Sequence, residues 1–162
     1  MAVTIRRARI DDVDACFAVQ KSADLAAFPH IFPPELFPFP DEEVRARWRE
    51  NLVDGDRYCV VAEDEGTIIG TAVLIGDFFD SVAVVPERWG SAVASDLYEV
   101  IIARAQTLGL ARLHLWVIEK NERARHLYES RGWRLDGRKK ELPFPPHPLV
   151  ISYTLDLPST PL

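Results

Sequence analysis

Cysteine is scarce in this sequence of 162 residues, and the two that occur, Cys16 and Cys59, lie far apart. Their separation matches no metal-binding or redox spacing, so the sequence predicts no metal site. Cys16 lies in a helical pattern and Cys59 in a strand pattern, both among apolar neighbours. We therefore expect two small core side chains rather than a nucleophile.

Long apolar runs are missing as well. No run approaches the roughly 20 residues that a membrane-spanning helix needs. No apolar stretch follows the arginines near the N-terminus, as it would in a secretory signal. The formal net charge of −6 also lacks the basic excess of a nucleic-acid binder. These absences favour a cytoplasmic protein that binds neither membrane nor nucleic acid.

Proline, in contrast, is abundant and clustered. Five of the twelve prolines and four of the eight phenylalanines lie in residues 28–40, and a second cluster occupies residues 143–148. Proline at this density excludes a regular helix or a central strand. Elsewhere no internal repeat or linker is visible, so we predict a single domain over residues 1–162.

Hydrophobic periodicity predicts four helices outside the proline-rich segments. Asp11 or Asp12 can cap the first, which runs to about Ala26, and Asp41 can cap the second. The third follows a loop at residues 87–92 and ends near Leu108. The fourth covers residues 121–131.

Seven strands are expected between these helices, with the second and third joined around Glu65-Gly66. The order β-α-α-β-β-β-α-β-α-β-β is typical of an α/β fold with a mixed, layered sheet. The strands are expected over residues 3–9, 57–64, 66–76, 78–86, 111–118, 132–141 and 149–157.

Residues 81–101 combine a strand, a loop with one glycine and an amphipathic helix. Backbone N–H groups at the start of a helix are unpaired and, with the helix dipole, suit a phosphate. Small residues at Gly90, Ser91, Ala92 and Ala94 would let a ligand approach. Neither GxGxxG nor GxxxxGK[ST] is present, and in isolation the segment is also compatible with a structural turn.

Residues 113–133 carry a second pattern. Asn121 is a good helix cap, and Ala124 and Tyr128 then lie on one face of the helix. Gly132 stands where a left-handed residue ends a helix, and Trp133 begins the next strand. A cap and a core aromatic residue would also explain these positions if the segment stood alone.

Together the two segments resemble the GCN5-related N-acetyltransferase (GNAT) superfamily. The family's motif V-x-x-x-N-x-x-A-x-x-x-Y-x-x-x-G-F/W is matched throughout, by Val117, Asn121, Ala124, Tyr128, Gly132 and Trp133. The resemblance covers nearly the whole chain. It implies a central, mostly antiparallel sheet of about seven strands flanked by about four helices.

The phosphate loop of the family follows V-x-P, here Val84–Pro86, and reads roughly Q/R-x-x-G-x-G/A. This sequence departs from it twice, because Trp89 replaces Gln or Arg and Ala92 replaces the first glycine. Trp89 removes a side-chain contact to phosphate but leaves the backbone donors. Ala92 is costly only where the backbone needs a positive φ.

The resemblance implies an acetyl-CoA-dependent N-acetyltransferase that passes the acetyl group directly to an amine of a small molecule or peptide. Tyr128 is the implied acid, because a phenol with a pKa of about 10 can protonate a thiolate. Arg88 could supply further positive charge near the phosphates. The implied acetyl-CoA-binding residues are Val84, Val85, Trp89, Gly90, Ser91, Ala92, Val93, Ala94, Asn121, Arg125 and Tyr128.

The resemblance leaves open which group acts as the general base that takes a proton from the amine. Asp80 lies where such families often carry an acidic residue, and His30, His147 and a water chain are rivals. His114, within a strand, is expected to be packed or hydrogen-bonded.

In the family, the loop between the first two helices and the last hairpin flank the acceptor. We therefore expect an acceptor wall that includes Phe28, His30, Phe32, Phe37, Phe39, Phe144 and His147.

Other interpretations remain. The proline-rich loops could pack on the body of the protein or form the contact of a homodimer. The departures at Trp89 and Ala92 are also compatible with a non-catalytic acyl-CoA-binding domain. The surface rich in phenylalanine and proline is also compatible with an interaction module. The sequence does not identify the acceptor amine or the acyl chain preference.

Overall fold

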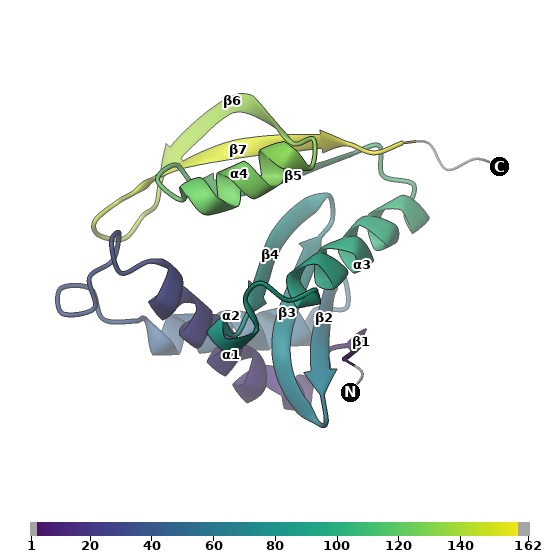
Figure 1. Ribbon diagram of the computed structural model, residues 1–162, viewed down its shortest axis with the longest axis horizontal. Coiled ribbons are helices and arrows are strands. Elements are labelled where there is room, and N and C mark those ends of the chain that lie inside the picture. The colour runs from purple at the N-terminus through teal and green to yellow at the C-terminus, as the bar shows by residue number, and fades with distance from the viewer. Residues whose placement is uncertain (1–2, 159–162) are drawn as a thin grey trace. The chain divides into compact units, whose positions relative to one another are not determined.

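The computed structural model describes residues 3–158. Within them the strands and helices follow the predicted order (Figure 1). The elements are β1 (Thr4–Arg7), η1 (Ile10–Asp12), α1 (Val13–Ala27), α2 (Asp41–Val53), β2 (Arg57–Asp64), β3 (Thr67–Ile75), β4 (Phe78–Val84), η2 (Pro86–Arg88), α3 (Val93–Thr107), β5 (Arg112–Ile118), α4 (Glu122–Ser130), β6 (Arg134–Glu141) and β7 (Leu149–Asp156).

The strands form a mixed sheet in the order β1-β2-β3-β4-β5-β7-β6. Strands β1 to β3 are antiparallel neighbours, as are β5, β7 and β6. The parallel pair β4–β5 has one register pair, Phe78 with His114. This architecture confirms the predicted α/β class with about seven strands and four helices.

The contacts within the chain divide it into two compact units. The first holds the residues up to Gly76 and Asp80–Ala103, and the second holds Asp77–Phe79 and the residues from Arg104 onward. The single domain expected over residues 1–162 therefore stays a prediction.

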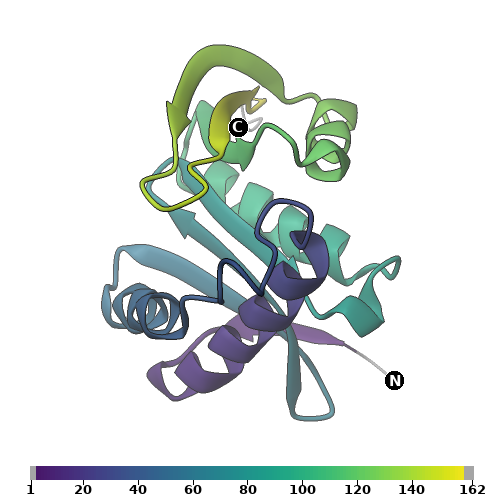
Figure 2. The same ribbon diagram turned by 90° about the vertical axis from the view of Figure 1, so that its left-hand side faces the viewer.

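In the first unit, α1 and α2 cover one face of the strands (Figure 2). The opposite face is close to α3, because a Cβ added at Gly70 would come within 2.8 Å of a Leu97 methyl carbon. Both cysteines are buried, as expected. The core beneath α1 and α2 consists of Cys16, Phe17, Trp48, Cys59, Val61 and Val73.

Two turns with positive φ confirm local predictions from the sequence. Glu65 and Gly66 join β2 to β3 with φ values of 50° and 82°, as a tight hairpin turn requires. Gly132 follows α4 with a φ of 92°, which is the left-handed conformation expected there.

The two predicted caps behave differently from expectation. The Asp12 carboxylate makes no capping bond to α1 and instead accepts hydrogen bonds from the Arg9 N–H and the Arg6 guanidinium. The Arg6 hydrogen bonds hold the pKa of Asp12 below its ordinary value. Asp41 is the first residue of α2 rather than its cap, and its carboxylate pairs with Lys21. The carboxylates of Asp12 and Asp41 thus bond to Arg6 and Lys21 instead of capping the helices.

In the second unit, β5 alternates buried and partly buried side chains, and Leu113, Leu115 and Val117 are buried. Helix α4 packs on the face of Tyr153, whose ring centroid lies 6.5 Å from that of Tyr128. None of the helices within residues 3–158 is both long and apolar enough to cross a membrane.

Candidate active site

The loop after β4 provides backbone donors at the start of α3. Gly90 adopts a φ of 82°, which favours glycine. The Asp96 backbone N–H donates to the Ala92 carbonyl at 2.9 Å, so the amides before it precede the helical bonding pattern. Among the residues that the structure describes, the N–H groups of Gly90, Ala92 and Ala94 have no hydrogen-bond partner. These donors fit the pyrophosphate of coenzyme A.

The two departures from the family loop have separate structural explanations. The Trp89 indole N–H donates to the Val84 carbonyl at 2.8 Å, which ties the loop back to the end of β4. Within residues 3–158, positive φ among non-glycine residues occurs at Glu65 and His147 and not at Ala92. The backbone at position 92 therefore does not require glycine, and Ala92 is exposed.

The remaining groups of the loop are bonded within the first unit. Val85 N–H donates to the Ile69 carbonyl at 3.0 Å. Ser91 Oγ donates to the Arg88 carbonyl at 2.6 Å and accepts from Val93 N–H at 3.4 Å. The Arg88 guanidinium forms an ion pair with Asp64, so its charge is already partly compensated before any phosphate binds.

In the second unit, Asn121 caps α4 as predicted. Its Oδ1 accepts from Ala124 N–H at 3.2 Å, and the amide nitrogen of the same side chain stays available as a donor. The Arg125 guanidinium donates to the Tyr153 hydroxyl at 3.1 Å and to the Glu119 carbonyl at 3.1 Å. Arg125 is thus held in place by protein partners.

Tyr128 lies on α4 as predicted and is partly buried. Its ring centroid lies 5.8 Å from that of Trp133, at an interplanar angle of 61°. The neighbouring Tyr153 hydroxyl donates to Glu129 at 2.8 Å. Burial raises the pKa of Tyr153, the Arg125 bond opposes this, and the Glu129 bond adds to it. Sequence reasoning missed Tyr153, because a tyrosine in a strand carries no motif.

Asp80 occupies the predicted strand position in β4. Its side chain is 9% exposed and forms an ion pair with Arg47 of α2. The carboxylate therefore already serves as the partner of a cation within the fold.

The proline-rich segment between α1 and α2 consists of successive turns. Phe32 N–H donates to the Phe28 carbonyl at 2.8 Å, and the two rings meet edge to face at 6.4 Å. Phe39 packs against Phe17 at 6.2 Å, so this part of the loop lies on the body of the first unit. His30 is exposed and Phe37 is partly buried.

The second proline cluster, in the other unit, joins β6 to β7. His147 is exposed and has a φ of 56°. Its Nδ1 lies 2.9 Å from the Leu142 carbonyl, which fixes the ring within the hairpin. Phe144 is 48% exposed. The exposed ring is consistent with a wall residue, while the histidine is held by its own loop.

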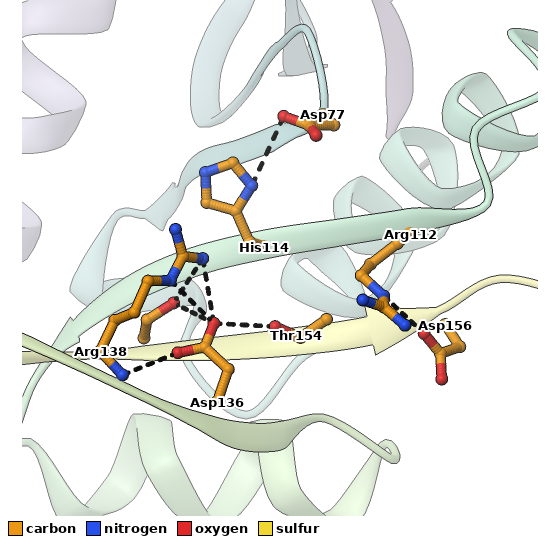
Figure 3. A network of polar contacts seen from close by, with 8 residues as sticks. Asp77, Arg112, His114, Asp136, Arg138, Thr154 and Asp156 are labelled. Carbon is orange, nitrogen blue, oxygen red and sulfur yellow. Dashed lines mark hydrogen bonds and ion pairs between the residues drawn. The ribbon is translucent and has the colours of Figure 1, made fainter.

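A polar network covers part of the sheet in the second unit (Figure 3). The Asp136 carboxylate accepts from Arg138 at 3.0 Å, Ser152 at 2.6 Å and Thr154 at 2.9 Å. Burial disfavours the charge of Asp136, but these bonds outweigh it and hold its pKa well below the ordinary value. The network joins β6 to β7 and stabilises the sheet.

His114, shown in the same figure, is packed and paired as the sequence predicted. Its ring stacks on Phe78 at 5.1 Å, and its Nδ1 lies 3.4 Å from the Asp77 carboxylate.

One carboxylate stands out that the sequence patterns did not single out. Asp24, in the last turn of α1, is partly buried, and its Oδ2 accepts from the Gln20 amide at 3.3 Å. Burial raises the pKa of Asp24 to about 6, and the Gln20 bond offsets part of the shift. A polar residue beside an apolar helical stripe was the only sequence signal for it.

Comparison with known proteins shows the family of this chain. The model of the acetyltransferase (GNAT) family matches residues 24–133. Uncharacterized N-acetyltransferases of Mycobacterium bovis and Mycobacterium tuberculosis are 32% identical over 135 residues, covering 79% of this chain and 86% of each relative. The chain therefore belongs to the GNAT family.

Solved structures share the fold. The PaiA N-acetyltransferase of Thermoplasma acidophilum, determined in complex with coenzyme A, has a TM-score of 0.76 at 15% identity, covering 94% of this chain and 98% of that one. The ribosomal-protein-S18-alanine N-acetyltransferase of Escherichia coli has a TM-score of 0.75 at 20% identity, covering 99% and 96%. A GCN5-related N-acetyltransferase of Rhodopseudomonas palustris reaches 0.79 at 17% identity, covering 97% of both chains.

Family membership defines the activity class. The protein is an N-acetyltransferase that takes an acetyl group from acetyl-CoA and transfers it to an amine. The free amides of the loop after β4 fit the phosphates of this donor.

Proposed function

We propose that residues 84–94, together with Asn121 and Arg125, bind acetyl-CoA and that Tyr128 protonates the sulfur that leaves. The observation that carries this proposal is the set of unpartnered N–H groups at Gly90, Ala92 and Ala94 before the first bonded turn of α3. Aligned amides at a helix start hold phosphates with the helix dipole behind them.

Each part of the donor then meets a matching group. The loop amides hold the phosphates, while the Asn121 side-chain N–H, which its capping bond leaves available, donates to the pantetheine arm. The backbone at Val84 and Val85 borders the same arm. Arg125, held by Tyr153 and Glu119, adds positive charge on the α4 side.

Acetyl-CoA supplies the reactive thioester. The residues of the chain have two further tasks, which are to accept a proton from the amine and to give a proton to the departing thiolate. Tyr128 suits the second task because a phenol, with an ordinary pKa of about 10, carries its proton at neutral pH and can donate it to the developing thiolate. Asp80 is the sequence candidate for the first, but its ion pair with Arg47 must loosen before it can accept a proton.

Phe28, His30, Phe32, Phe144 and His147 are proposed to border the acceptor, a small-molecule or peptide amine. A homodimer, a cytoplasmic location and the behaviour of residues 1–162 as one domain also remain proposals from the sequence.

The test measures release of free thiol from acetyl-CoA in the presence of a panel of primary amines. Wild-type protein is expected to release thiol only with an amine present. Tyr128→Phe is expected to lower kcat by about 100-fold or more with little change in the KM of acetyl-CoA. Unchanged turnover of Tyr128→Phe across the pH range would remove the acid role of Tyr128.

Binding without transfer is the competing outcome. Acetyl-CoA at 100 times its Kd should stabilise the fold by about 2.7 kcal/mol, which a thermal unfolding experiment detects. Stabilisation without amine-dependent thiol release would point to a non-catalytic acyl-CoA-binding domain.

A further inference from the structure

Five partly buried carboxylates among the described residues are each paired with an arginine. Their side chains are between 9% and 25% exposed, and each carboxylate lies within ion-pair distance of a guanidinium. Such pairing is what partial burial of a charge requires. The pairs are Asp12 and Glu63 with Arg6, Asp64 with Arg88, Asp80 with Arg47, and Asp136 with Arg138.

Asp24 breaks this pattern. Within residues 3–158, its carboxylate has no cationic partner and accepts one hydrogen bond, from the Gln20 amide to Oδ2. Its Oδ1 accepts none. The bond is long, at 3.3 Å, so it compensates little of the desolvation of the charge.

The orientation of Asp24 is nevertheless fixed. The buried Trp48 donates its indole N–H to Gln20 Oε1 at 2.8 Å, which leaves the Gln20 amide nitrogen facing Asp24. Gln20 and Asp24 are four residues apart on α1 and therefore share a face. These two hydrogen bonds link Trp48 of α2 to Gln20 and Asp24 of α1. They orient the Asp24 carboxylate but do not neutralise its charge.

The surroundings of Asp24 suit an organic cation. Phe28 lies one helical turn later, since its N–H donates to the Asp24 carbonyl at 2.9 Å. Its ring meets that of Phe32 edge to face. Aromatic rings in the turn that follows a carboxylate can add attraction for an ammonium group and for an apolar body.

The acyl-donor loop belongs to the same compact unit. Helix α1 contacts η2, the short helix with which that loop begins. Asp24 and the proposed phosphate-binding amides are thus parts of one packed body.

We propose that Asp24 binds the protonated acceptor amine and takes one of its protons, and that the acceptor is a primary monoamine on an apolar body. This inference rests on the proposed function and names the missing proton acceptor and substrate class of that site.

The step balances as follows. The ammonium loses one proton to Asp24, which passes it to solvent. The nitrogen lone pair forms a C–N bond with the thioester carbonyl carbon, and the C–S bond breaks. The thiolate takes a proton from Tyr128, and the second proton lost by nitrogen restores the phenol. The products are the amide, free thiol and one proton.

No other charge near α1 supplies the missing partner, since only burial and the Gln20 bond shift the pKa of Asp24. Five cationic groups of the packed elements are paired with other carboxylates, and His30 and Glu35 lie exposed on the following loop. Those pairs are Lys21 with Asp41, Arg45 with Asp14, Arg47 with Asp80, Arg88 with Asp64, and Arg6 with Asp12. The other charged side chains of α2 and η2 are exposed, namely Glu42, Glu43, Arg49, Glu50 and Glu87.

The experiment uses the full chain, acetyl-CoA, and three probe amines, which are 2-phenylethylamine, hexylamine and spermidine. The two monoamines are expected to have a higher kcat/KM than spermidine. In Asp24→Asn, the kcat/KM of the better monoamine should fall about 100-fold, while the KM of acetyl-CoA stays within about twofold. The acid limb of the kcat/KM profile, near the Asp24 pKa of about 6, should disappear.

Glu35→Gln is the matched control, because it removes an exposed carboxylate from the adjoining loop, and it should behave as wild type. Asp24→Glu keeps a carboxylate on a longer stem and should retain the acid limb with a raised acceptor KM. If Asp24→Asn does not fold, Asp24→Glu replaces it in the test. Loss of the acid limb from the kcat/KM profile of Asp24→Glu would then overturn the inference.

The experiment separates failure of the proposed function from failure of the Asp24 role and from failure of the substrate class. If wild-type protein transfers acetyl to none of the amines, the proposed function itself fails. If wild-type protein is active and Asp24→Asn stays within threefold of it, Asp24 has no role with the acceptor. If spermidine is the best probe, the apolar monoamine is the wrong substrate class.

Discussion

A carboxylate that is buried without a cation should destabilise the fold, and the Asp24→Asn variant measures by how much. The pKa of Asp24 is raised by burial from 3.8 in the unfolded chain to about 6 in the folded one. The folded state therefore binds this proton more tightly than the unfolded state. Stability linked to Asp24 is fully present below about pH 4 and is lost as the pH rises through about 6.

The magnitude follows from the difference in pKa. Each factor of ten in the protonation equilibrium corresponds to about 1.4 kcal/mol, so a pKa difference of about 2 corresponds to about 3 kcal/mol. Asp24 retains some contact with solvent, so about 2 kcal/mol is the more realistic expectation. In a chain of this size, this corresponds to roughly 4 to 8 °C in Tm.

The assay is urea unfolding of wild type and Asp24→Asn at several pH values from 4 to 8. The expected result is that the variant gains about 2 kcal/mol relative to wild type between pH 4 and pH 8. The comparison between two pH values matters because the constant cost of burying an asparagine amide cancels. All other titrating groups are common to both proteins and cancel as well.

Glu35→Gln serves again as the control and should give a curve parallel to wild type, since Glu35 is exposed. Parallel curves for wild type and Asp24→Asn would refute the reasoning, because they would mean that the folded chain compensates the charge of Asp24. If Asp24→Asn is more stable than wild type at pH 8 but does not acetylate amines, Asp24 contributes to function at a cost in stability.

Three further predictions concern the rest of the site and its support. Gly90→Ala should raise the KM of acetyl-CoA roughly tenfold in steady-state kinetics, since the φ of 82° costs an L-residue about 1–2 kcal/mol. Ala92→Gly should leave this KM unchanged. Equal effects of the two substitutions would contradict the assignment of the loop to acetyl-CoA. Asp136→Asn should lower the free energy of unfolding by about 2 kcal/mol at pH 7. Because the Asp136 pKa is depressed, this loss should shrink as urea unfolding is repeated toward pH 3, and a constant difference would argue against it. Phe32→Ala and Phe144→Ala should raise the acceptor KM much more than the KM of acetyl-CoA, and equal, negligible effects on both would exclude these rings from the acceptor wall.

The parts of the fold that sequence predicts well are those specified by neighbouring residues. Asn121 caps α4 through a bond to Ala124 three residues away, and Gly132 ends that region with a positive φ. Both follow from local backbone geometry, so spacing alone reveals them. The same holds for the turn at Glu65-Gly66.

The parts that sequence predicts poorly depend on distant partners. Asp12 and Asp41 looked like caps, but their carboxylates bond to Arg6 and Lys21 through the fold. Asp80 occupied the expected strand position, yet its partner Arg47 comes from a helix 33 residues earlier. Local spacing contains no information about which cation folds back onto which carboxylate.

The proposed proton acceptor, Asp24, differs from the sequence candidate, Asp80, in the partner that the fold gives its carboxylate. Both are acidic, both are removed from bulk water, and only Asp80 lay where the family resemblance directs attention. Asp80, however, is joined to a guanidinium, and a proton could reach it only by competing with that pair. Asp24 is oriented by Gln20 and Trp48 without being neutralised. An ammonium substrate would supply the cation that the fold leaves out, so binding would relieve a charge whose burial the protein otherwise bears at a cost in stability.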